Sequence, residues 1–178
     1  MKTRVLLSVF FSLLFVLSCS KTEKLNTIVS DDATGDSIFL GYGTVDVLKH
    51  DIFRKYYVDG LNDYHPADSL IDSLRPALKA VTFKVIMGTW DTRSRKVVPQ
   101  LFNVLFSVGS YDPSSQSNVE LIGVNRAMKA GNIDLDDYKV KRLPLIIVYR
   151  SGEEAGRLQG KLSEPMEKVL FDILTKKK

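Results

Sequence analysis

Strand-like and helix-like apolar patterns follow one another between Val81 and Leu174. Residues 81–87 alternate and are rich in β-branched side chains, which favours a strand, whereas residues 94–108 place apolar side chains on one helical stripe despite Pro99. The later predicted elements are strands over 119–124 and 143–149, a short helix over 134–138, a hairpin strand over 155–159 and a last helix from Ser163. We therefore predict an α/β fold with a mixed central sheet flanked by helices, in which helical connections give parallel pairing and the closing hairpin adds an antiparallel edge.

Two more helices are predicted before the first of these strands, as an N-terminal helical extension. Apolar residues recur at helical spacing over residues 45–60 and again over 68–79, where Asp68 is a candidate N-cap. Three tyrosines of this extension are expected to pack onto the domain, with contact to a peptide as the alternative: Tyr56, Tyr57 and Tyr64.

The N-terminus has the pattern of an export signal. Lys2 and Arg4 precede an uncharged apolar run that is short for a membrane-spanning helix and ends at Cys19. The residues just before that cysteine, Val16-Leu17-Ser18, resemble a lipobox, where bacteria cleave and lipidate a cysteine. We interpret residues 1–18 as a lipoprotein signal peptide and Cys19 as the lipidated residue. An ordinary signal peptide or an uncleaved anchor are the alternatives.

The residues after Cys19 are expected to connect a lipid anchor to a single domain. Residues 19–36 are polar and show no apolar period, so they are predicted to be a flexible tether. The rest of the chain, 37–178, has the size of one domain with its own core. This organisation predicts a protein of the bacterial cell envelope, anchored to a membrane through lipid, with its domain in the periplasm or at the cell surface.

The cysteine count and the charge balance exclude several classes of function. The chain has one Cys, so a lipidated Cys19 leaves the folded part without a disulfide, a thiolate nucleophile or a cysteine metal ligand. Loss of residues 1–18 leaves 23 Lys and Arg against 21 Asp and Glu, and three of the cations form the C-terminal tail, which argues against nucleic acid as a partner. His50 and His65 have no metal-ligand spacing, so we expect neither a metal nor a cofactor.

Two segments resemble the thioredoxin fold. One is Val85-Ile-Met-Gly-Thr-Trp90, a strand that runs into a tryptophan at a helix start, and the other is Arg142-Leu-Pro-Leu, which is similar to the cis-proline strand. Within that fold, the chain looks closest to a bacterial thioredoxin-like group with the segment Gly-x-Trp-Cys-x-Asp-Ser-Arg-Arg-x-x-Pro. The positions of this chain that match that segment are Gly88, Trp90, Ser94, Arg95 and Pro99.

The resemblance implies a thioredoxin-like domain over 37–178 and a peptide groove between Trp90 and the turn at Leu143 and Pro144, whose X-Pro peptide can be cis. The resemblance does not extend to the residues that carry thiol chemistry, because Asp91 stands at the position of the reactive cysteine and Ser94 at that of the second cysteine. Neither side chain can form a mixed disulfide with a substrate. We therefore predict no catalytic residue and do not expect an enzyme.

Asp91 is interpreted as a structural N-cap, because a helix start offers unpaired N–H groups to any anion. The alternative is a general acid or base, for which the sequence offers no partner. Arg93 and Arg95 are expected to pair with Asp91 and nearby acids, with binding of a carboxylate or phosphate as the alternative.

These observations favour a membrane-anchored, redox-inactive thioredoxin-like lipoprotein that acts as a binding or scaffold module, with a polypeptide partner in the envelope. The candidate groove residues are Trp90, Asp91, Arg93, Ser94, Arg95, Leu143 and Pro144. The alternatives are an oxidoreductase-family protein that borrows a thiol, a non-redox enzyme built on Asp91 and its neighbours, and a domain that serves only as a spacer.

Overall fold

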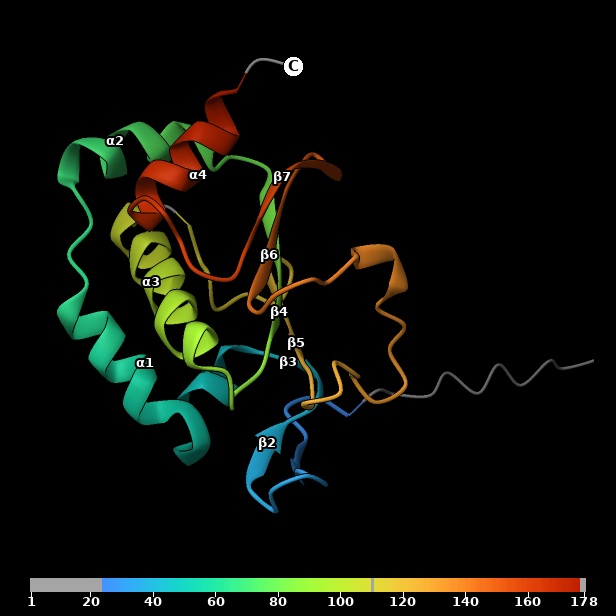
Figure 1. Cartoon of the computed structure of the whole chain (residues 1–178). Helices are drawn as coiled ribbons and strands as arrows, with labels where there is room; N and C mark the ends of the chain where they lie inside the picture. Colours follow the sequence, from blue (N-terminus) through green and yellow to red (C-terminus); the bar gives the residue numbers. More distant parts are fainter. Residues whose placement is uncertain (1–23, 110, 177–178) are drawn as a thin grey trace, which may run out of the picture.

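The computed structural model describes residues 24–109 and 111–176, which contain a mixed five-stranded sheet with helices against it (Figure 1). The strand order is β3-β5-β4-β6-β7, and β4 runs parallel to β5 and antiparallel to β6. The bounds are β3 Gly41–Gly43, β4 Val81–Met87, β5 Val119–Gly123, β6 Leu145–Arg150 and β7 Glu153–Gln159. The predicted α/β class and the mixed sheet are confirmed. The expected parallel pairing holds for β4 and β5 only, because β6 runs antiparallel to β4, and the antiparallel edge strand β3 was not predicted.

The helices pack on one face of the sheet (Figure 1). A 3₁₀ turn at Val45–Lys49 leads into α1 (Asp51–Asp63), which lies along α3 (Thr92–Val108), while α2 (Asp68–Ala77) lies against α4 (Met166–Thr175). Alternate residues of β4, such as Phe83 and Val85, point into this core, as the two-residue period of a strand requires.

The opposite face of the sheet is covered by the segment that joins β5 to β6. Ile86, Ile122 and Ile147 form a second apolar cluster beneath this segment, which includes a short 3₁₀ turn at Asp136–Tyr138. The Lys84 ammonium ties the segment to the sheet, because it donates a 2.7 Å hydrogen bond to the Tyr138 hydroxyl and lies 3.3 Å from the Glu120 carboxylate.

A buried carboxylate fastens the α1–α2 connection to the start of α4. Glu167, only 4% exposed, accepts hydrogen bonds from the Tyr64 hydroxyl and from the Ala67 N–H. The Tyr64 hydroxyl in turn accepts a bond from the Met166 N–H. Tyr64 therefore packs onto the domain as predicted, and so does Tyr57, which is 4% exposed.

The structure differs from the predicted tether over the second half of residues 19–36. Strand β1 (Ile28–Ser30) pairs with β2 (Ser37–Phe39) in an antiparallel hairpin, and Asp31 in its turn is 4% exposed. The sequence pattern missed this hairpin because a three-residue strand is too short to show a period. A smaller correction concerns α2, which is preceded by Ala67 with no side-chain cap, so Asp68 is its first residue and not its N-cap.

The predicted signal peptide, 1–18, and the lipidation of Cys19 lie outside the described residues. Within the described part of the chain, none of the helices combines the length and the apolar character that crossing a membrane requires.

Candidate functional site

Asp91 caps α3 with its side chain. Its Oδ2 accepts hydrogen bonds from the Ser94 N–H at 2.7 Å and from the Ser94 hydroxyl at 3.0 Å, and its main-chain oxygen accepts from the Arg95 N–H at 3.0 Å. The Asp91 side chain is only 5% exposed. The predicted N-cap role of Asp91 is confirmed, and the carboxylate is bonded within the helix start instead of facing a substrate.

The second carboxylate oxygen of Asp91 binds Arg93. Arg93 donates to Asp91 Oδ1 from Nε at 3.3 Å and from Nη2 at 3.1 Å, which confirms the expected pairing. Ser94 is fully buried, and besides donating to Asp91 its Oγ accepts from the Gly88 N–H at 3.4 Å. Asp91 and Ser94 thus satisfy each other, and neither is placed as a nucleophile or as a free base.

Within residues 24–109 and 111–176, Arg95 has no ion pair with an acid, contrary to the expectation. Its Nε donates a 2.7 Å hydrogen bond to the Thr89 carbonyl, and its guanidinium carbon lies 4.4 Å from the centre of the Tyr56 ring in α1. A guanidinium can stack on the face of an aromatic ring while its N–H groups donate hydrogen bonds in the plane of the guanidinium itself. Arg95 therefore connects the loop before α3 to α1.

Trp90 folds back onto the domain. Its indole N–H donates to the Val124 carbonyl at 2.9 Å, and its ring packs beside Leu143 in the second apolar cluster. A Cβ at Gly88 would lie 2.8 Å from the Trp90 ring, so glycine at this position makes room for the ring. Leu143 and Pro144 are buried, and the peptide between them is cis, as the sequence suggested.

The predicted groove residues on this side of α3 are engaged in contacts with one another and with the domain. The structure brings Trp90 and Leu143 into one cluster and sets Asp91, Arg93 and Ser94 in one hydrogen-bonded group at the helix start, while Arg95 points toward α1. A residue that the sequence did not single out as functional lies over the Trp90 ring. This residue is Arg126, whose guanidinium carbon lies 5.1 Å from the ring centre.

The sequence also missed three residues of this site, which are Asp31 and Phe39 of the N-terminal hairpin and Thr89 of the loop before α3. Asp31 binds Arg126, and the Phe39 N–H donates to the buried Thr89 hydroxyl at 3.2 Å. Asp31 stands in a polar segment without apolar period, and its ion pair joins residues 95 positions apart. No local pattern signals such a contact, so the sequence held no clue to it.

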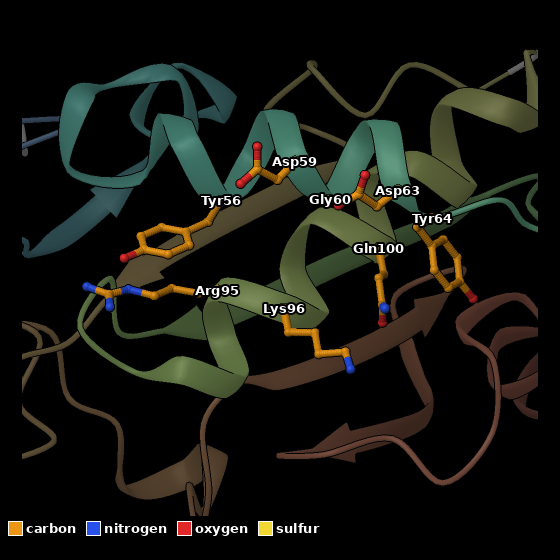
Figure 2. Close-up of a pocket in the computed structure, with 8 residues that line it drawn as sticks. All are labelled: Tyr56, Asp59, Gly60, Asp63, Tyr64, Arg95, Lys96 and Gln100. Atoms are coloured by element: carbon orange, nitrogen blue, oxygen red, sulfur yellow. The ribbon is translucent and has the colours of Figure 1, made fainter.

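A separate hollow of about 350 Å³ lies on the other side of the α3 start, between α1 and α3. Figure 2 shows Tyr56 and Arg95 side by side at one end of this hollow, and Tyr64 at the other. Its lining residues are Tyr56, Asp59, Gly60, Asp63, Tyr64, Arg95, Lys96 and Gln100. Asp59 is paired with Lys55, and Arg95 is engaged as described above. The hollow therefore presents mixed charges to a ligand.

The described stretches, 24–109 and 111–176, contain no cluster of metal-ligating side chains. No group of three or more His, Cys, Asp or Glu side chains is arranged there to hold a metal ion. His50 accepts from the Ile52 N–H at the start of α1, and His65 lies exposed after that helix. The one Cys of the sequence, Cys19, lies before the described residues.

Comparison with known proteins does not assign a family. No protein-family model matches the chain, and no curated protein matches it.

Proposed function

We propose that this protein is a redox-inactive, thioredoxin-like binding module, anchored to an envelope membrane by lipid at Cys19 and contacting a polypeptide partner through the start of α3. The observation that carries the proposal is the state of Asp91, whose two carboxylate oxygens are both taken up by Ser94 and Arg93. A residue in that state stabilises the scaffold and leaves no group for acid–base or thiol chemistry at the helix start.

The thioredoxin-like assignment is supported by the strand order and by the place of the helix start. Helix α3 follows the central strand β4, and the Leu143–Pro144 peptide precedes β6, the strand beside it. These features agree with the residues that carry the resemblance, Gly88 to Pro99 and Arg142 to Leu145.

The charges at the start of α3 favour an acidic partner segment. Arg93, Arg95 and Lys96 lie in its first turns, where the helix dipole also presents positive partial charge. Beside them stands Arg126, whose guanidinium lies over Trp90. The only carboxylate of this helix start, that of Asp91, is already engaged. An extended segment with Asp or Glu side chains matches this surface.

Two measurements test the proposal. The full-length chain with Cys19→Ser should reduce insulin no faster than buffer containing dithiothreitol, and a turnover above that background would refute redox inactivity. In the native envelope, cross-linking should capture a partner with the wild-type protein. Capture should weaken with Trp90→Ala and with Arg95→Glu, but not with Lys79→Glu, a charge reversal at an exposed site after α2. Equal capture by all variants would refute the proposed surface.

A further inference from the structure

Three side chains stand in series between the N-terminal hairpin and the proposed contact surface. The Asp31 carboxylate lies 2.6 Å from Arg126 Nε, and the Arg126 guanidinium carbon lies 5.1 Å from the centre of the Trp90 ring. The Arg126 side chain thus lies over the indole with Asp31 holding it in place. Arg126 therefore covers the Trp90 ring, and Asp31 in the hairpin turn holds Arg126 in that position.

The burial of Asp31 is unusual for a residue in a surface turn. Asp31 is 4% exposed, and its Oδ1 accepts from the Ala33 N–H at 3.1 Å while its Oδ2 binds Arg126. A second carboxylate, that of Asp36, lies 3.7 Å from Arg126 Nη2. Removing one partner of a partly desolvated ion pair is unfavourable, because the other charge is left without compensation. The position of the hairpin turn therefore depends on the ion pairs that Asp31 and Asp36 form with Arg126.

The hairpin is fixed to the domain at its far end. The Phe39 ring is fully buried and occupies the space beside Gly43 and Gly123, where an added Cβ would lie 2.5 Å from it. The Phe39 N–H is bonded to Thr89, two residues before Asp91. A segment that is anchored at one end by buried side chains and held at the other by ion pairs to one residue, Arg126, can open at the second end alone.

We propose that the β1–β2 hairpin is a strap that keeps the Trp90 surface closed, and that an acidic partner opens it by competing with Asp31 for Arg126. This inference rests on the proposed function for the identity of the competitor, an acidic polypeptide segment. The strap itself is a property of the isolated chain. In the closed state, Arg126 covers the indole; in the open state, Trp90 and Arg126 both face the partner.

The chain carries its own reporter, because Trp90 is its only tryptophan. In the full-length protein with Asp31→Asn, acrylamide should quench Trp90 fluorescence about twofold more strongly than in wild type. The matched control is Asp32→Asn, which removes the same charge from the neighbouring exposed position and should quench like wild type. Backbone amides of residues 28–37 should exchange hydrogen about tenfold faster or more in Asp31→Asn, while those shared by β4 and β6 should not change.

Three results would overturn the strap. The first is unchanged quenching in Asp31→Asn. The second is an equal change in Asp32→Asn, which would assign the effect to net charge. The third is faster exchange throughout the sheet, which would make the hairpin part of the cooperative core.

Partner capture separates the failure of the strap from that of the proposed function. If the strap operates, Asp31→Asn should capture more partner than wild type, and Asp32→Asn should capture the same amount. Capture that is equal in all three, with the fluorescence change present, refutes regulation of partner binding by the strap. An absence of any partner refutes the proposed function and leaves the fluorescence and exchange results to decide on the strap.

Discussion

At the start of α3, the carboxylate of Asp91 stands at the position where the thioredoxin-like group that the sequence resembles has a reactive cysteine. Asp91 accepts the Ser94 N–H and hydroxyl and pairs with Arg93, all within three residues of chain. The cap and the ion pair are local, so capping preference and the opposite charges of Asp91 and Arg93 were sufficient to predict them from the sequence. The contact of Arg95 with Tyr56 depends on how α1 lies against α3, and local preference does not carry that information.

Replacing Asp91 with Ala should lower the free energy of unfolding by about 1–2 kcal/mol, because the α3 start loses its cap and the buried Ser94 loses an acceptor. Asp91→Ser keeps a capping oxygen and should lose less. Urea unfolding followed by circular dichroism measures both variants. Stability of Asp91→Ala equal to that of wild type would contradict the structural role of this residue.

Elements with a long apolar period were predicted well. The helix expected over 94–108 is α3, and the strand expected over 81–87 is β4 with the same bounds. The three-residue strands β1, β2 and β3 were missed, because they show no period and are set by pairing with distant or neighbouring strands. At the start of α3, the cap by Asp91 and its pairing with Arg93 were predicted, whereas the contacts of Arg126 with Asp31 and Trp90 were not.

The contact of α1 with α3 depends on a glycine. A Cβ placed at Gly60 would lie 2.4 Å from the Cβ of Pro99, which belongs to a rigid ring. In an exposed helix, Gly→Ala stabilises by about 1 kcal/mol. Here we expect Gly60→Ala to lower the free energy of unfolding by about 1–3 kcal/mol, because the two helices must move apart.

A double-mutant cycle tests that cause. Pro99→Gly removes the opposing Cβ, so Gly60→Ala should cost clearly less in the Pro99→Gly background than in wild type. Val58→Ala, at an exposed position of the same helix, is the control and should change stability by less than about 0.5 kcal/mol. Equal costs of Gly60→Ala in both backgrounds would show that the Gly60–Pro99 contact is not the reason.

For the whole molecule, buried and partly buried tyrosines contribute to the response to alkaline pH. Burial raises the pKa of Tyr57 to about 12, and burial also raises the pKa of Tyr64 and of Tyr111. The unfolded chain releases these protons near pH 10, whereas the folded chain holds them to higher pH. The stabilisation is therefore complete below about pH 10 and is lost as the pH rises toward the folded-state pKa values.

We expect the free energy of unfolding to fall between pH 9 and pH 11, with Tyr57 contributing about 1 kcal/mol of the decrease. Urea midpoints at the two pH values measure the decrease, and absorbance of tyrosinate reports ionisation directly. Tyr57→Phe removes one of the titrating groups, so its stability should decrease less over the same range. The same decrease in wild type and in Tyr57→Phe would contradict the assignment.

The hydrogen bonds that Glu167 accepts from the Tyr64–Ala67 connection have a consequence for biosynthesis. The groups that Glu167 satisfies emerge from the ribosome about 100 residues before it does. Until then Tyr64 lacks its acceptor, and α2 has no α4 to pack on. A nascent or truncated chain that stops short of α4 therefore lacks the acceptor of Tyr64 and the helix against which α2 packs, and we expect proteases to digest it faster than the full-length protein.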